Sequence, residues 1–263
     1  MSIFKLYIEY EGTRFSGWQI QKNARTVQGE LIVAIKKVFN LNEIEFQGSG
    51  RTDAGVHALR QVAHLEVKTN LATDIIRMRL NDELPADINI LGVEKALNNF
   101  HARHDAVARS YVYQISRRRT AFGKKYVWWI KDELDVEKMK QTAALFIGMK
   151  NFQSFTDDKP EDKSTKVLID DIEIKEDGDL ILIRITGSHF IWKMVRRVVG
   201  VIAEVGRGNL SIEKVRTYLN TKSNEPARLT APPSGLFLEQ VLYKGDKKNA
   251  ELTPLIKVKN LIL

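Results

Sequence analysis

The sequence predicts an α+β fold made of two successive α/β halves. The first half shows strand, helix, strand, strand, helix and strand patterns in turn, and the second half continues with further strands and helices. Its 263 residues suffice for one large domain or two of common size, and an apolar share of 43% supplies sizeable cores. We therefore expect a globular protein.

The first half opens with a strand at 3–10, where apolar residues alternate along the chain. Thr26 precedes a stretch with an apolar face, so we expect it to cap a helix over 27–39. Pro85 is expected to stop a second helix. Thr73 is expected to cap that helix, which runs to about Leu84, and the other elements expected here are strands at 44–47, 59–67 and 88–97.

The second half contains the same kinds of pattern. Its expected elements are a strand at 109–114, a helix from its cap Asp135 to about Gly148, a strand pair at 166–175 and 179–187, a strand end leading into a helix within 187–206, a helix from Ser211 to about Asn220, and a strand within 230–243.

The chain is basic, and its charge is uneven. The net charge is +8 and the pI is near 9.5, which makes an anionic partner plausible without separating RNA from DNA or an acidic lipid surface. Residues 101–125 hold seven basic side chains against one acidic one, whereas 157–179 hold ten acidic against four basic. Such polarity suits docking of a polyanion in one orientation, although each stretch alone is equally typical of a solvated loop.

The sequence has no cysteine, which excludes disulfides, thiolate catalysis and Cys-ligated zinc or iron–sulfur sites. No run approaches ~18 apolar residues, so we expect no transmembrane helix and no membrane partner. The N-terminal segment alternates like a strand, so we expect no signal peptide and a cytoplasmic location.

The segment 48–57, GSGRTDAGVH, is the strongest candidate for a site. It lies between two expected strands, and it combines three glycines with Arg51 and Asp53. A free Asp titrates near pH ~3.9, and a neighbouring guanidinium opposes any upward shift of its pKa, so Asp53 is a candidate nucleophile or base. The alternative is an ordinary tight turn at 52–55 whose Asp bonds its own backbone.

The longer segment GRTDAGVHALRQVAHLE resembles the signature of the TruA-type tRNA pseudouridine synthases. In that family the Asp of the RTDAG loop is catalytic, a role that the resemblance gives to Asp53. The resemblance covers about residues 3–243. Its other segments are YEGTRFSGWQ, NNFHARHDAVAR, RSYVYQ, NFQSF, SHFIWKMVRRVVG and TAPPSGLFLEQVLY.

The resemblance also implies roles outside the RTDAG loop. Tyr111, the first tyrosine of RSYVY, would lie against the target base, and Arg196 of MVRRVVG would pair with the catalytic carboxylate. Without the resemblance, Arg196 is equally well interpreted as a helix-surface arginine. Arg197 stands where relatives more often carry Asn. The substrate-binding residues expected are Arg51, Tyr111, Leu236, Arg103 and Arg109.

Three histidines need separate interpretation. His101 and His104 are spaced to share a metal on one helical turn, but no third ligand follows at that spacing, and we favour packing or phosphate contact. His64 is expected to be a satisfied polar residue on a strand. We therefore expect no metal site.

The resemblance implies two ferredoxin-like α/β domains with a shared, mainly antiparallel sheet and a central basic cleft. We expect an N-terminal domain at 1-105 with the catalytic loop, a C-terminal domain at 106-245 with RSYVY and MVRRVVG, and a tail at 246-263. The implied substrate is the anticodon arm of tRNA, with uridines 38 to 40 as targets. The implied oligomer is a homodimer.

The implied reaction is an isomerisation of uridine to pseudouridine, which requires no cofactor. Two other classes remain open: a non-catalytic RNA-binding protein with the same fold, and a nucleoside hydrolase. A hydrolase of the paired-carboxylate type needs a second acid beside Asp53, and the loop offers Arg51.

Overall fold

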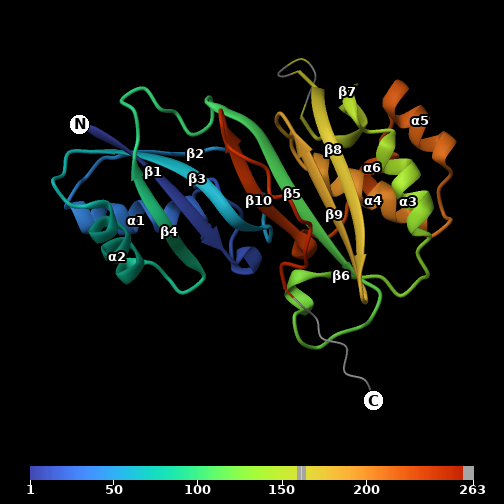
Figure 1. Cartoon of the computed structure of the whole chain (residues 1–263), viewed down its shortest axis with the longest axis horizontal. Coiled ribbons are helices and arrows are strands. Elements are labelled where there is room, and N and C mark those ends of the chain that lie inside the picture. The colour runs from blue at the N-terminus through green and yellow to red at the C-terminus, as the bar shows by residue number, and fades with distance from the viewer. Residues whose placement is uncertain (159–160, 162–163, 257–263) are drawn as a thin grey trace. The chain divides into compact units, whose positions relative to one another are not determined.

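The computed structural model describes residues 1–158, 161 and 164–256. The chain forms two compact units. The first unit comprises Met1–Val107 and Phe237–Lys247, and the second unit comprises Ala108–Leu236 and the described residues from Lys248 onwards. Each unit combines helices with a mainly antiparallel set of strands (Figure 1), as the sequence predicts.

The first unit has its strands in the order β4-β1-β3-β10, with β2 also paired to β3. The β10–β3 pair is parallel, and the pairs of β3 with β1 and β2 and of β1 with β4 are antiparallel. The elements are β1 (Ser2–Tyr10), η1 (Gly12–Arg14), α1 (Val27–Phe39), β2 (Glu45–Gly48), β3 (His57–Val67), α2 (Thr73–Glu83), β4 (Ile88–Lys95) and β10 (Leu236–Tyr243).

Helices α1 and α2 contribute to the core of this unit. Leu6 and Ile8 alternate along β1 and are fully buried, as are Leu31 and Ile35 of α1. Because side chains alternate across a strand, β1 gives one apolar face to the helices. Helix α2 packs on β4 and on α1 (Figure 1).

The N-terminal caps of the two helices differ. The Thr26 hydroxyl accepts a hydrogen bond from the backbone N–H of Gly29 at 3.2 Å, so the predicted cap of α1 is confirmed. The prediction that Thr73 caps α2 is wrong. Thr73 is the first helical residue, and the capping position is held by Ala72, whose side chain has no acceptor.

The second unit has its strands in the order β5-β9-β8-β7, with β6 parallel to β5. The pairs among β5, β9, β8 and β7 are antiparallel. The elements are β5 (Ala106–Ser116), η2 (Lys124–Tyr126), β6 (Trp128–Trp129), α3 (Val136–Ala144), β7 (Gly148–Asn151), η3 (Gln153–Phe155), β8 (Lys166–Asp177), β9 (Leu180–Gly187), α4 (Met194–Gly206), α5 (Ile212–Asn220), α6 (Glu225–Arg228) and η4 (Pro233–Gly235).

Helix α3 is shorter than the sequence predicts. Asp135 caps it as expected, by accepting the N–H of Lys138 at 3.0 Å, but the helix ends at Ala144 instead of near Gly148. Gly148 has φ +92°, which is not a helical conformation, and it begins the strand that pairs with Ile169 of β8. Strand pairing therefore competes with the last helical turn and prevails.

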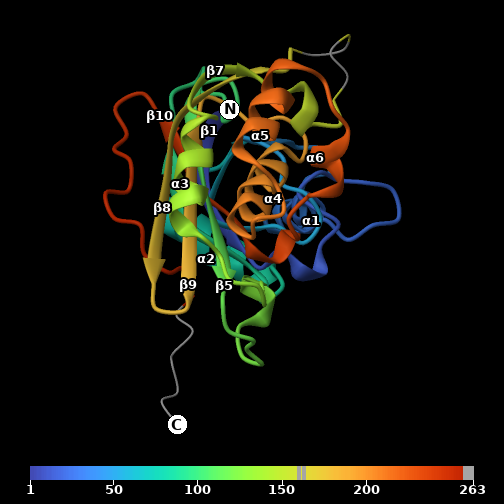
Figure 2. The same ribbon diagram turned by 90° about the vertical axis from the view of Figure 1, so that its right-hand side faces the viewer.

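The two faces of this sheet are covered differently. Helices α3 to α6 gather on one side of it (Figures 1 and 2). On β5, Val112 alternates with the tyrosines that flank it and packs with Leu182 against Leu252 of the C-terminal segment. The carbonyl oxygen of Leu252 accepts a hydrogen bond from Lys175 Nζ at 3.0 Å. The described part of the predicted tail therefore docks on its own unit.

The compact units can be compared with the predicted domains. The chain leaves the first unit after Val107, two residues past the predicted boundary, whereas Phe237–Lys247 groups with the first unit because β10 pairs with β3. Of the predicted tail, residues 257–263 lie outside the described residues. The assignment of the predicted ranges to separate domains stays a prediction. In the described residues, no helix has the length and apolar character needed to cross a bilayer.

The Thr26 cap gives a test of this local structure. We expect Thr26→Ala to lower the free energy of unfolding by about 1 kcal/mol, because the N–H of Gly29 loses its acceptor in a buried place. Urea denaturation followed by circular dichroism measures the change. Thr26→Ser keeps the hydroxyl and should stay close to wild type; an equal loss in both variants would contradict the capping role.

Candidate active site

The loop at 49–56, between β2 and β3, is held against the loop between β1 and α1. The backbone N–H of Trp18 donates to the carbonyl oxygen of Thr52 at 3.1 Å. The hydroxyl of Thr52 also shares a hydrogen bond of 2.8 Å with the hydroxyl of Tyr10. Thr52 is thus held by both its main chain and its side chain. The backbone that leads into the next residue, Asp53, is therefore held as well.

Two glycines of the neighbouring loop permit this contact. Gly17 has φ +94°, and a β-carbon there would lie 2.7 Å from the carbonyl oxygen of Thr52. At Gly12 a β-carbon would lie 2.0 Å from the carbonyl oxygen of Val56. Among the three glycines that the sequence placed in the candidate loop, only Gly55 has a positive φ, +78°. The glycines that matter most therefore belong to the supporting loop.

The other end of the candidate loop is fixed by buried polar side chains. Ser49 Oγ donates to Gln61 Oε1 at 2.6 Å, and Gln61 Nε2 donates to the carbonyl oxygen of Gly50 at 3.1 Å. Ser49 and Gln61 are almost fully buried. Between the two fixed ends, Arg51 is exposed and Asp53 is half-buried. This geometry leaves the carboxylate on a supported loop, as a catalytic group requires.

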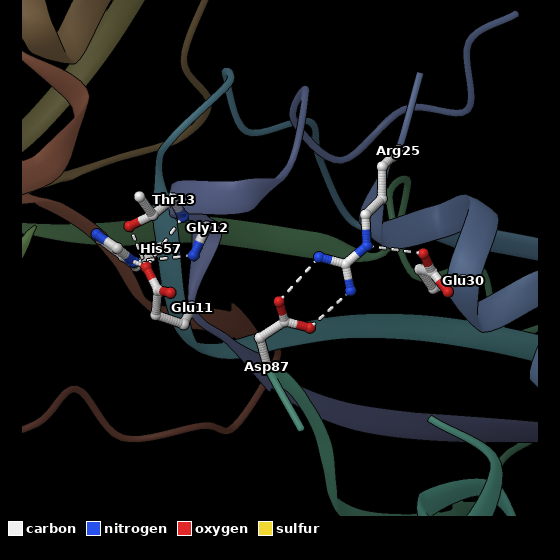
Figure 3. Close-up of polar contacts among 7 residues, drawn as sticks. All are labelled: Glu11, Gly12, Thr13, Arg25, Glu30, His57 and Asp87. Carbon is white, nitrogen blue, oxygen red and sulfur yellow. Dashed lines mark hydrogen bonds and ion pairs between the residues drawn. The ribbon is translucent and has the colours of Figure 1, made fainter. Parts of the chain in front are cut away.

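A buried histidine joins the supporting loop to β3 (Figure 3). The backbone N–H of Gly12 donates to His57 Nδ1 at 2.9 Å, and Glu11 Oε1 accepts the N–H of Thr13 at 3.0 Å. Glu11 Oε1 lies 3.7 Å from His57 Nδ1. Because Nδ1 accepts this hydrogen bond, the neutral ring carries its hydrogen on Nε2, and the Glu11 approach is not an ion pair. The His57 ring stacks on Phe237 at 4.7 Å.

An arginine holds the supporting loop from its other end (Figure 3). Arg25 forms a bidentate pair with Asp87, with both N–O distances at 2.9 Å, and its Nε donates to Glu30 at 2.9 Å. Its guanidinium lies 4.2 Å from the centre of the Phe15 ring. The sequence analysis identified neither His57 nor Arg25. The signal available for His57 was a polar residue at the start of a buried strand.

In the second unit, β5 presents two tyrosines towards α4. Tyr111 is 8% exposed, and its ring meets the edge of Phe190 at 5.1 Å and 85°. Tyr113 is fully buried and donates its hydroxyl to the carbonyl oxygen of Pro232 at 2.8 Å. Burial raises the pKa of Tyr113 well above 10, against the opposing effect of the Arg196 charge, so this phenol stays protonated.

Arg196 lies in the first turn of α4 and is locked to the segment 229–231. Its Nε donates to the carbonyl oxygen of Ala231 at 2.7 Å, and the N–H of Ala231 donates back to the carbonyl oxygen of Arg196 at 3.0 Å. A β-carbon on Gly200 would lie 1.6 Å from the carbonyl oxygen of Leu229, so this close crossing requires glycine. Arg196 is half-buried and engaged, which disfavours the surface-arginine interpretation.

The other expected binding residues differ in exposure. Leu236 is 4% exposed at the start of β10, Arg103 is exposed, and Arg109 is half-buried with its guanidinium donating to the carbonyl oxygen of Ser188 at 3.0 Å. Their contacts with a substrate stay predictions.

The histidines are engaged with the backbone. His64 is 3% exposed, and its Nδ1 accepts the N–H of Ala102 at 3.1 Å, so the prediction of a satisfied strand residue is confirmed. His101 Nδ1 accepts the N–H groups of Arg103 and His104 at 3.1 and 3.2 Å. His101 Nδ1 is thus engaged by backbone donors, and packing or phosphate contact of this pair stays a prediction.

Asp157 supports the start of α4, a role that the sequence did not predict. Arg197, named only as a departure from the family pattern, is 4% exposed and pairs with Asp157, which also accepts Lys193 Nζ at 2.7 Å. Burial pushes the pKa of Asp157 up, but the hydrogen bonds from Lys193 and Arg197 outweigh it and hold the pKa below its usual value. Residues 159–160 and 162–163 of this acidic loop lie outside the described residues.

The Asp157 cluster predicts an acid-sensitive contribution to stability. At neutral pH, Asp157→Asn should lower the free energy of unfolding by about 2 kcal/mol, since the buried Arg197 loses its counter-charge. A carboxylate whose folded pKa is depressed stabilises above its unfolded pKa, near ~3.9, and loses that effect as pH falls through the folded pKa. The difference between wild type and Asp157→Asn should therefore shrink on acidification.

Urea denaturation at neutral pH and near pH ~3 measures both effects. Asp170 is exposed, so Asp170→Asn is the control for the change in net charge and should resemble wild type. A destabilisation by Asp157→Asn that is the same at both pH values would contradict the assignment.

The expected site residues divide between the units. Arg51, Asp53 and Arg103 belong to the first unit, whereas Arg109, Tyr111, Arg196 and Leu236 belong to the second. Within the second unit, Arg196 is near enough to influence Tyr113 electrostatically.

Comparison with known proteins gives a consistent result. A family model described as tRNA pseudouridine synthase matches residues 6–105 and 142–244. "tRNA pseudouridine synthase A 2" of Clostridium perfringens (strain 13 / Type A) is 37% identical over 245 residues, covering 92% of this chain and 100% of that protein. "tRNA pseudouridine synthase A" of Thermoanaerobacter sp. (strain X514) is 38% identical over 240 residues, covering 90% and 98%.

Among solved structures, the chain is similar to "Crystal structure of the archaeal box H/ACA sRNP Nop10-Cbf5 complex". The TM-score is 0.39 at 12% identity, covering 88% of this chain and 59% of that chain. The family model matches most of the sequence, and the Clostridium relative is covered over its full length. The chain therefore belongs to the tRNA pseudouridine synthase family, a family of isomerases, as the RTDAG segment predicted.

Proposed function

We propose that this protein converts uridine to pseudouridine in the anticodon stem-loop of tRNA, with positions 38 to 40 as its targets. The observation that carries the proposal is Asp53 of the RTDAG loop, half-buried on a loop supported at both ends, in a chain of this family. The names of the relatives, tRNA pseudouridine synthase A, support the substrate class.

The reaction rearranges the nucleoside without changing its composition. The bond from N1 of uracil to C1′ breaks, the base turns, and C5 bonds to C1′; C5 then loses a proton and N1 gains one. Because atoms and electrons balance within the substrate, the reaction consumes no redox cofactor or nucleoside triphosphate. It needs a group that labilises the glycosidic bond and a pocket that retains the freed base.

Asp53 is the group proposed for the first requirement. Its carboxylate either adds to C1′ or removes a proton from C2′. Both routes require the carboxylate to lie beside the ribose of the target uridine. The fixed carbonyl and hydroxyl of Thr52 beside it support this role, because catalysis is sensitive to displacements of about 1 Å.

The retaining pocket is proposed to come from the second unit. Tyr111 would hold the freed ring by its face, with Phe190 supporting it at 5.1 Å, and Leu236 would pack near the base. Tyr113 is assigned no substrate contact, because it is fully buried and its hydroxyl donates to the carbonyl oxygen of Pro232.

Positive charge is the third element of the proposal. Arg196 is proposed to pair with the Asp53 carboxylate, and either Arg196 or Arg51 would contact the phosphate of the extruded nucleotide. Unstacking a uridine costs a few kcal/mol, which contacts of Arg103, Arg109 and the basic stretch up to Lys125 with phosphates would offset.

The finer architecture belongs to the same proposal. We infer two ferredoxin-like domains that share a sheet and form a central basic cleft for the anticodon arm, with a homodimer as the active assembly and the cytoplasm as its location. The strand, helix, strand, strand, helix, strand order of residues 2–95, with antiparallel pairing and two helices packed together, supports the first domain.

The two rival classes differ in product. A non-catalytic RNA-binding protein would bind tRNA and leave uridine unchanged, and a nucleoside hydrolase would release free uracil. Incubation with a tRNA transcript, followed by nucleoside analysis, therefore separates all three. Pseudouridine without released uracil is the expected result.

Asp53 is tested by Asp53→Asn, which keeps the shape of the side chain and removes its charge. We expect pseudouridine formation to fall by at least about 10³-fold, with tRNA affinity within about twofold of wild type, because the carboxylate carries the chemical step. Nucleoside analysis under single-turnover conditions and a binding titration measure both quantities. Pseudouridine produced by pure Asp53→Asn at the wild-type rate would overturn the assignment.

Arg196→Ala should lower the single-turnover rate by about 10²-fold and tRNA affinity by a smaller factor, because its charge is proposed to act on the carboxylate. Arg196→Lys keeps a cation and should recover part of the rate. Equal losses of rate and affinity would indicate that Arg196 only docks the RNA.

A further inference from the structure

Trp192 leaves its indole 52% exposed immediately before α4. A tryptophan has a large apolar surface, and Trp18 of this chain is by contrast 2% exposed. Single exposed apolar side chains are ordinary on protein surfaces, so exposure alone carries no function. The environment of Trp192 is what distinguishes it.

The main chain at Trp192 is held in place from a second segment. Its backbone N–H donates to Asp158 Oδ2 at 3.0 Å. The next residue, Lys193, has φ +60°, a left-handed conformation that side chains other than glycine rarely adopt, and its Nζ bonds Asp157 at 2.7 Å. The two neighbouring acids and the start of α4 therefore hold the backbone from which the Trp192 side chain extends.

Trp192 is also close to the proposed pocket of the second unit. Two residues before it, Phe190 meets the ring of Tyr111 at 5.1 Å. Four residues after it, Arg196 begins its contacts with Ala231. Consecutive Cα atoms are 3.8 Å apart, so Trp192 lies within about 8 Å of Phe190 and about 15 Å of Arg196 along the chain.

The charge beside the indole suits a nucleotide. Lys193 Nζ lies 4.7 Å from the centre of the Trp192 ring. Lys193 and Arg197 share the carboxylate of Asp157, and Asp158 bonds the Trp192 N–H, so the two cations and two carboxylates balance, while the Lys193 ammonium itself lies against the indole. Proteins that bind single-stranded nucleic acid combine aromatic rings, on which bases stack, with nearby cations that meet the phosphates.

We propose that Trp192 is a stacking platform for a base adjacent to the target uridine, with Lys193 contacting the phosphate of that nucleotide. The proposal rests on the proposed function for the identity of the RNA. It adds a residue for affinity and positioning that is distinct from the proposed catalytic residues. When the target uridine leaves the helical stack, its neighbour loses a stacking partner, and the indole replaces that partner.

The test measures binding of an anticodon stem-loop transcript to the full chain. We expect Trp192→Ala to weaken binding by at least about fivefold, the lower end of the range for loss of one stacked base, and Trp192→Phe to stay within about twofold of wild type. RNA should quench part of the tryptophan fluorescence, and Trp192→Phe should abolish that part. The thermal unfolding midpoints should agree, because the side chain is outside the core.

Trp129 provides a matched control in the same unit. It is 41% exposed and has Arg119 5.7 Å from its ring centre. Trp129→Ala should bind like wild type. Wild-type affinity in Trp192→Ala, equal weakening by Trp192→Ala and Trp192→Phe, or equal weakening by Trp192→Ala and Trp129→Ala would each overturn the stacking role.

Assaying pseudouridine in the same samples separates this inference from the proposed function. If wild type modifies the transcript and Trp192→Ala binds it normally, the stacking role alone fails. If wild type binds the transcript and makes no pseudouridine in any tRNA, the proposed function fails, and a binding loss in Trp192→Ala still supports an RNA contact.

Discussion

The close approach of Gly17 to the carbonyl oxygen of Thr52 is the constraint on which the candidate site depends. No β-carbon fits between them, and the adjoining N–H of Trp18 bonds the same oxygen. The loops at 11–26 and 49–56 thereby become one rigid layer, with Arg25 and His57 fixing its remaining ends. A carboxylate that starts from this layer needs little reorganisation to act, which is how a scaffold lowers the entropy of a reaction.

The second unit uses the same physical device at α4. Gly200 lets the segment 229–231 cross the helix closely enough for Arg196 to exchange two hydrogen bonds with Ala231. At the helix start, Asp157 neutralises part of the charge of Lys193 and of the buried Arg197. The helix is therefore fixed at both its side and its beginning. In both units, backbone contacts position the segments that carry the charged side chains.

This division of labour fits an isomerisation. The reaction needs no external donor, so beyond the proposed carboxylate of Asp53 the protein has to position groups, retain the freed base and hold the RNA in its extruded conformation. The aromatic residues of the second unit, Tyr111, Phe190 and Trp192, suit the last two tasks, since flat rings accept a base without demanding a hydrogen bond pattern. Basic residues add attraction for phosphates that does not depend on sequence.

The sequence by itself determined most elements and the family. Alternation in residues 3–10 and the cap at Thr26 are local signals, and local physics placed β1 and α1 correctly; GRTDAGVH identified the candidate loop. Where a partner strand competes, local signals failed: α3 ends early because Gly148 starts β7. Only the tertiary structure decided that Gly17, His57 and Asp157 support the site. Their partners lie about 35 to 45 residues away in the chain, and no local pattern encodes contacts that form only when distant backbones meet.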